Sequence, residues 1–173
     1  GKDFTFGSLF IHSNNDGLKY NEDILSFDGL YRFPENPVRF QFQYANSWNK
    51  NGDVKQEGAA YQLYSYYQSN DAGGPFADAS YKRVSKGFNA TTSFNNQIGL
   101  PDNYDEISAS GGYKFIFDRK YFSDINVNGG FYRGRILEDN GSLPADFKLQ
   151  NNVYVNTNYK VAEWLRFNQY FEY

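Results

Sequence analysis

Residues Val38 to Trp48 read VRFQFQYANSW, and this stretch decides the fold class. Val38, Phe40, Phe42 and Tyr44 alternate with polar residues along its first half. Because side chains alternate between two faces along a β-strand, this period of two predicts a strand with one aromatic and one polar face. The pattern leaves open which face points inward. A soluble sandwich or lipocalin-like barrel buries its aromatic face, whereas an outer-membrane barrel turns that face toward lipid.

The same alternation recurs in further segments along the whole chain, and no segment has the period of a helix. These segments read DFTFGSLFIH, LSFDGLYRF, AYQLYSYYQ, FADASYKRV, EISASGGYKFIF, DINVNGGFYRG, QNNVYVNTNYK and LRFNQYFEY. The first and fourth of them alternate less cleanly than the others. We therefore expect about nine strands and an all-β fold that forms a single domain over residues 1–173. Together with the composition, the connections and the polar faces, the expectation is an antiparallel up-and-down transmembrane β-barrel.

The composition favours the membrane reading of this pattern over the soluble one. The chain has 173 residues, of which 20% are aromatic, with 17 Phe and 16 Tyr but only 2 Trp. A soluble core relies mainly on branched aliphatic side chains, which are sparse here. Membrane barrels combine a low mean hydropathy, −0.74 in this chain, with many aromatic residues, because half of each strand is polar and aromatic girdles line both interfaces.

The predicted connections suggest two different ends of the sheet. Short connections are expected at Pro34 to Pro37, Asp118 to Tyr121 and Val161 to Trp164, with a slightly longer one at Asn70 to Pro75. Longer polar connections are expected between them, at Ser13 to Leu18, Asn49 to Gly58, Ser85 to Asn103 and Leu137 to Phe147. Strict alternation of short and long connections is typical of outer-membrane barrels, whose periplasmic turns are short. A lipocalin-like barrel with an open mouth remains the alternative.

The polar faces of the strands carry Gln, Asn, Ser and Tyr rather than a dense mixture of Lys and Glu. A soluble outer surface would favour such charges, whereas amides and tyrosines suit a hydrated interior. The residues expected to line this interior are Arg39, Gln41, Gln43, Lys114, Asn126, Asn128, Tyr154, Asn156, Arg166 and Tyr170. The residues expected to face lipid are Phe40, Phe42, Tyr44, Phe115, Phe117, Phe131, Tyr159, Phe167 and Phe171. Interior amides and tyrosine rings could contact sugars or other solutes, or could only bond to one another.

The run from Ser85 to Phe115 resembles a family of outer-membrane barrels of Gram-negative bacteria. In this uncharacterised family the barrel follows a carbohydrate-binding, family-nine-like module. Gly87-Phe88-Asn89 and Gly99-Leu100-Pro101-Asp102 stand where that family has its Gly-Phe-Asn and second Gly-hydrophobic steps, although the Arg of its next step is missing. Tyr20-Asn21, Phe27-Asp28-Gly29 and the run Gln43 to Ser47 are similar to its opening strands. The resemblance implies a C-terminal barrel in the outer membrane and no particular reaction.

Few residues suggest catalysis or metal binding. His12 is the only histidine and the chain has no cysteine, so we expect no enzymatic activity, no metal site and no cofactor. Acidic and Asn-rich clusters could supply calcium ligands at Asn14 to Gly17, at Asp102 with Asp105 and Glu106, and at Glu138 to Gly141. None has the EF-hand spacing, and turn formation explains such sequences better.

These observations predict a protein of the outer membrane with the lipid bilayer as its main partner. It would serve as a pore, a channel or the membrane anchor of a surface complex, with a link to glycan or solute uptake. The alternatives are a purely structural scaffold subunit, which would contact other outer-membrane subunits, and a soluble ligand-binding barrel. A net charge of −3 without any basic cluster argues against a nucleic-acid partner. Nine strands would be an odd number, so we also expect a fragment of a larger barrel.

Overall fold

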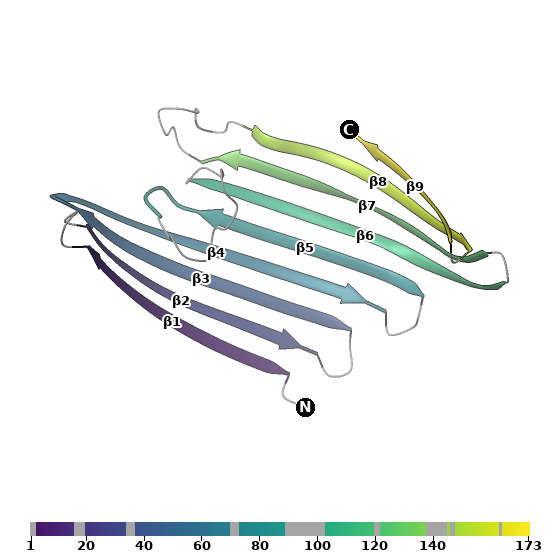
Figure 1. Cartoon of the computed structure of the whole chain (residues 1–173), viewed down its shortest axis with the longest axis horizontal. Helices are drawn as coiled ribbons and strands as arrows, with labels where there is room; N and C mark the ends of the chain where they lie inside the picture. The colour runs from purple at the N-terminus through teal and green to yellow at the C-terminus, as the bar shows by residue number, and fades with distance from the viewer. Residues whose placement is uncertain are drawn as a thin grey trace.

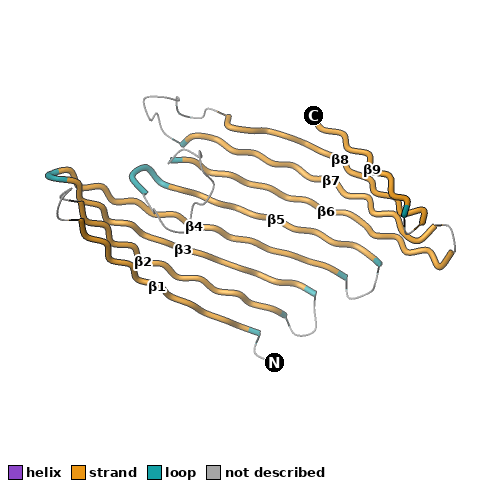
Figure 2. The backbone as a smooth tube through the Cα atoms, in the orientation of Figure 1, coloured by secondary structure: helices purple, strands orange, loops and turns teal. Residues whose placement is uncertain are grey.

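A computed structural model describes residues 3–15, 20–33, 37–69, 73–88, 103–119, 122–137, 145, 148–162 and 164–173. All regular structure in this part of the chain is β-strand (Figure 2). The strands are β1 (Phe4–Asn15), β2 (Tyr20–Arg32), β3 (Val38–Asn51), β4 (Val54–Gln68), β5 (Gly74–Val84), β6 (Tyr104–Arg119), β7 (Phe122–Ile136), β8 (Lys148–Ala162) and β9 (Leu165–Glu172). Among the described residues, no helix is long and apolar enough to cross a membrane.

The nine strands form one sheet in which every strand pairs antiparallel with its neighbour in the sequence. This confirms the predicted all-β, up-and-down arrangement. The sheet is not closed over the described residues, because β1 and β9 form its two edges and lie far apart in the view of Figure 1. Closure into a barrel, which the sequence as a whole predicted, is therefore not confirmed by this sheet.

The strand register places residues of one kind side by side over several neighbouring strands. One row runs through Phe42, Leu63, Tyr81 and Ile107 from β3 to β6. The neighbouring row, on the opposite side, contains Gln41, Tyr64, Ser80, Ser108, Tyr132 and Asn152. Since successive residues of a strand point to opposite faces, the sheet has an aromatic face, which bears the first row, and an amide face, which bears the second.

The amide face is the more crowded of the two. Along β5, Ala77 and Ala79 on the aromatic face are exposed, whereas Asp78 and Ser80 on the amide face are half-buried. Small alanine side chains lie open on one side while polar side chains on the other are partly covered. Side chains on the inside of a curved sheet converge, so this difference matches a sheet that curves around its amide face.

Two of the predicted longer connections are wrong. Ser13 to Leu18 is not a longer connection, because β1 continues to Asn15 and β2 begins at Tyr20, which leaves four residues between them against five between β2 and β3. Asn49 to Gly58 is not a long polar loop, because β3 continues to Asn51, β4 begins at Val54, and Gly52 and Asp53 form a two-residue turn. Gly52 has a φ of 62°, the positive value that a tight hairpin needs at its first central position. The connections therefore do not alternate strictly between short and long.

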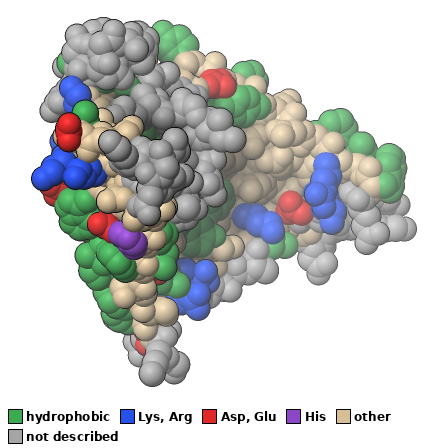
Figure 3. All heavy atoms as spheres, turned by 60° about the vertical axis from the view of Figure 1, so that its left-hand side comes forward, with side chains coloured by type: hydrophobic (Ala, Val, Ile, Leu, Met, Phe, Trp, Pro, Cys, Tyr) green, Lys and Arg blue, Asp and Glu red, His purple; other side chains and the backbone are tan. Residues whose placement is uncertain are grey.

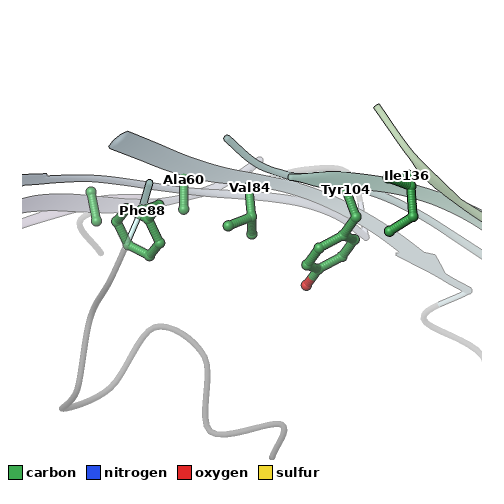
Figure 4. Close-up of a cluster of buried hydrophobic side chains, with 6 residues drawn as sticks. Ala60, Val84, Phe88, Tyr104 and Ile136 are labelled. Atoms are coloured by element: carbon green, nitrogen blue, oxygen red, sulfur yellow. The ribbon is translucent and has the colours of Figure 1, made fainter. Parts of the chain in front are cut away.

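The most deeply buried hydrophobic side chains lie on the amide face. Ala45, Ala60, Val84, Tyr104 and Ile136 follow one another along a single row from β3 to β7. Phe88, which follows β5, packs with them and is only 6% exposed. Figure 4 shows Val84, Tyr104 and Ile136 projecting from the same side of the sheet, with Phe88 beside Ala60. This apolar row was not expected on the polar faces of the strands.

Candidate functional site

The ten residues predicted to line an interior all lie on the amide face, although they come from five strands. Arg39, Gln41 and Gln43 lie on β3, and Gln43 pairs across the sheet with Gln62. The others are joined by the register of β6 to β9, in the pairs Lys114 with Asn126, Asn128 with Asn156, Asn156 with Tyr170, Tyr154 with Glu172 and Arg166 with Lys160. The register thus brings them onto one surface. Whether this surface lines a wet interior stays a prediction.

The nine residues predicted to face lipid lie on the aromatic face. Exposure is 48% for Phe40, 42% for Phe131 and 68% for Phe171. Most of the other exposed large hydrophobic side chains share this face: Phe4, Phe6, Phe10, Tyr31, Tyr44, Leu63, Ile107, Tyr113, Phe115, Val127, Val153, Val155 and Phe167. A continuous apolar surface of this extent on a soluble monomer would be unusual, because such patches mark contact with a partner or a membrane.

Charged residues border the aromatic face at one end of the sheet. This end carries the β1–β2, β3–β4, β5–β6 and β7–β8 connections and is called here the loop end. His12 Nδ1 lies 2.6 Å from Asp23 Oδ1 between β1 and β2. Farther along the same end, Arg135 donates two hydrogen bonds to Asp105, from Nε to Oδ1 at 3.0 Å and from Nη2 to Oδ2 at 3.1 Å. Charged side chains of both signs gather at the end of the molecule that Figure 3 brings forward.

Aromatic rings gather at the opposite end of the same face, called here the turn end. The Phe33 ring makes edge contacts with Tyr31 at 4.7 Å and with Phe40 at 5.9 Å between centroids. Tyr113 and Phe115 lie 4.5 Å apart on β6. The aromatic face therefore consists of an apolar band with a charged border at the loop end and an aromatic border at the turn end.

Cross-strand hydrogen bonds join the polar side chains of the amide face. Ser80 and Ser108 lie 2.8 Å apart between their hydroxyl oxygens, and Tyr132 donates to Glu106 at 2.9 Å. Ser110 donates to Asp78 on the neighbouring strand. These bonds cover only part of the face, because the Oδ1 atoms of Asn126 and Asn156 are buried without a hydrogen-bond partner in the described structure.

A groove runs along the amide face over β2, β3 and β4. Its volume is about 410 Å³, and it is lined by Leu30, Arg32, Arg39, Gln41, Tyr64, Tyr66 and Gln68. A second groove shares Gln41 and Tyr64 with it and continues to Gln43 and Gln62. A third shares Tyr66 and Gln68 and reaches Lys114 and Asn126. Together these three grooves form one polar surface, called here the amide trough.

Sequence reasoning found part of this trough. Arg39, Gln41, Gln43, Lys114 and Asn126 were among the predicted interior residues. The candidate set omitted Arg32, Tyr64, Tyr66, Gln62 and Gln68, although each alternates with apolar residues on its own strand. Strand alternation shows that these side chains share a face of their strand, but only the pairing register shows that they meet those of β3.

The Ser85 to Phe88 turn folds over the amide face near its loop end. Ser85 N donates to Ala59 O at 2.9 Å, and Ala59 N donates to Ser85 Oγ at 2.8 Å. A Cβ atom placed on Gly58 would lie 2.1 Å from Phe88 N, so only glycine leaves room for the turn at this position. The turn thereby brings Phe88 against the apolar row. Within the family resemblance, Gly87 and Phe88 are described, whereas Asn89 and the run Gly99 to Asp102 lie outside the described residues.

The described residues contain no group of three or more His, Asp or Glu side chains that could hold a metal ion. Asp105 and Glu106 point to opposite faces of β6, where they bond to Arg135 and Tyr132 respectively. The other candidate calcium ligands, at Asp16 to Gly17, Asp102 and Glu138 to Gly141, lie outside the described part of the chain. His12 is paired with Asp23 at the charged border.

Comparison of the chain with family models, with curated proteins and with solved structures finds no match. The resemblance to outer-membrane barrels therefore stays a prediction.

Proposed function

We propose that this chain forms the wall of an outer-membrane β-barrel, with the aromatic face toward lipid and the amide face toward a water-filled interior. The observation that supports this most is the division of the sheet into one face with most of the exposed large apolar side chains and one face with most of the hydrogen-bonding side chains, clearest from β3 to β9. Barrel walls in membranes have this division, because lipid requires apolar side chains and the interior requires polar ones.

The dimensions of the sheet support the same proposal. The strands contain between 8 and 16 residues, and a tilted strand needs roughly 9 to 11 residues to cross the hydrocarbon core of a bilayer. The charged and aromatic borders of the aromatic face would then lie at the two interfaces. Trp48, exposed at the loop end opposite Asp23 and Glu57, suits such an interface as well.

A barrel also requires partners for the unpaired edges of β1 and β9, since a lipid-exposed sheet edge would leave backbone groups without hydrogen bonds. In an up-and-down sheet with nine strands, β1 and β9 run in the same direction. Further strands or a second copy of the chain would satisfy these edges.

Of the roles that such a wall can serve, the amide trough favours an aqueous channel for solutes over a simple membrane anchor. An anchor needs only a stable interior, whereas the trough leaves cationic and amide side chains open to solvent. The second proposed role is to anchor a surface complex in the membrane.

The test is reconstitution of the full chain into phosphatidylcholine vesicles and planar bilayers. We expect the chain to insert, to resist proteolysis after insertion, and to show stepwise ion conductance. Insertion without conductance would favour the anchor. A chain that stays folded and monomeric in plain buffer and does not insert would contradict the membrane proposal and favour the soluble ligand-binding barrel.

A further inference from the structure

Two arginines face each other in the amide trough without a carboxylate between them. Arg32 on β2 and Arg39 on β3 are direct register partners, and both line the largest groove of the trough. Both are exposed, and neither forms an ion pair among the described residues. Like charges that lie directly opposite each other in a sheet are destabilising, so this pair needs another explanation than stability.

The carboxylates nearest in the register do not neutralise this pair. Asp3 follows Arg32 toward the sheet edge, where its backbone oxygen accepts a hydrogen bond from Arg32 N at 2.6 Å, but its carboxylate forms no ion pair with the guanidinium. Asp78 lies opposite Tyr66 and accepts a hydrogen bond from Ser110. Lys114, at the end of the trough, adds a third cation. Among the described residues, no carboxylate forms an ion pair with Arg32 or Arg39, and Asp78 places the one negative charge beside Tyr64 and Tyr66.

The remaining trough side chains are suited to a hydroxylated solute. Tyr64 and Tyr66 lie two residues apart on the same face of β4, and Gln41 and Gln68 flank them. Amides donate and accept hydrogen bonds, and tyrosine combines a flat apolar ring with a hydroxyl group. An arginine guanidinium binds a carboxylate through two parallel hydrogen bonds.

We propose that the amide trough binds acidic sugars, with the carboxylate held by Arg32 and Arg39 and the hydroxylated ring held by the neighbouring tyrosines and amides. This proposal names a class of solute for the proposed channel. Only its physiological role, transport of that solute, rests on the proposed function. Binding itself requires only a folded sheet.

The experiment measures binding to the full chain by isothermal titration calorimetry. It is carried out in detergent micelles or in buffer, whichever keeps the chain folded. The probes are the disaccharide of galacturonic acid and the galactose disaccharide with the same linkage, which lacks the carboxylates. Arg32→Gln and Arg39→Gln remove one guanidinium each. Arg133→Gln, an exposed arginine on the aromatic face, is the matched control. Circular dichroism verifies that each variant retains the sheet.

We expect the acidic disaccharide to bind about tenfold or more tightly than the neutral one, and either trough variant to lose about tenfold or more in affinity for the acid. The Arg133→Gln variant should bind like the original chain. The ligand-free trough variants should also unfold at a higher denaturant concentration, because the repulsion between the two guanidinium groups is gone.

Equal affinity for the two disaccharides, no binding by the folded chain, or an equal loss in the Arg133→Gln variant would overturn the proposal. Conductance enters none of these readouts. A chain that binds the acid but does not conduct would contradict only the channel, and a chain that conducts but does not bind would contradict only the acidic-sugar site.

Discussion

Gly58 is the residue at which the connection after β5 meets the sheet. A Cβ atom there would lie 2.1 Å from Phe88 N and 2.5 Å from Phe88 Cα, and neither is the end of a flexible side chain. We expect Gly58→Ala to displace the Ser85 to Phe88 turn and to lower the free energy of unfolding by about 1–3 kcal/mol, the usual cost of overpacking. Urea unfolding of the folded chain, followed by circular dichroism, measures this change.

Gly111 provides the matched control for that substitution. It also lies within a strand, but an added Cβ atom would meet its nearest neighbour, Phe76 O, at 3.4 Å, an ordinary contact distance. Gly111→Ala should therefore leave the unfolding midpoint almost unchanged. If both substitutions shift the midpoint equally, the close approach of Phe88 to the sheet does not contribute to stability.

At the scale of the strand, β3 and β4 offer a direct comparison of the two faces. Leu63 on the aromatic face is 53% exposed, and Gln41, which pairs with the adjacent Tyr64, is exposed on the amide face at nearly the same depth. In vesicles, we expect Leu63→Arg to lower the free energy of unfolding by about 2–4 kcal/mol, the cost of an arginine at the centre of a bilayer. Gln41→Arg should cost much less, because its side chain would remain in water.

The same pair of variants distinguishes an aromatic face in lipid from one exposed to water, whereas a soluble barrel that buries this face would also be destabilised by Leu63→Arg. In a soluble protein with this face exposed to water, Leu63→Arg would place a charge in solvent and would improve solubility without destabilising the sheet. Denaturant titrations of both variants in vesicles, with matched titrations in buffer, provide the comparison. A smaller loss for Leu63→Arg than for Gln41→Arg would contradict an orientation of the aromatic face toward lipid.

The strands were predictable where a period of two runs through a strand that is apolar on one side. Val38 to Tyr44 is such a stretch, and the structure confirms a strand there. The hairpin beyond it was missed because Val54 is the only apolar residue from Asn49 to Gln56, so the alternation that marks a strand disappears. Asn51-Gly52-Asp53 was the available signal, since Gly with Asn or Asp between polar runs is typical of a tight hairpin.

The apolar row on the amide face was beyond prediction for a different reason. Ala45, Ala60, Val84 and Ile136 come from four strands, and each one looks like an isolated exception to the polar face of its own strand. Their common position depends on register, which is set by pairing across the sheet rather than by local sequence. Phe88 follows the end of β5, where no periodicity indicates its direction.

At the scale of the whole molecule, the opposed faces predict a specific pattern of chemical accessibility, and the absence of cysteine from the chain makes it measurable. Single cysteines can be placed at Leu63 and Val155 on the aromatic face and at Gln41 and Tyr170 on the amide face, all of them exposed. In vesicles, a membrane-impermeant maleimide should label the two amide-face cysteines and leave the other two unmodified, because lipid covers only the aromatic face. After unfolding in urea, all four should react equally, which controls for intrinsic reactivity.

Rapid labelling of Leu63→Cys and Val155→Cys in vesicles would show that water reaches the aromatic face, and the barrel proposal would then be wrong for the entire sheet rather than for one strand. Protection of all four positions would instead indicate that the amide face is sealed, which would contradict the channel but leave the membrane anchor standing.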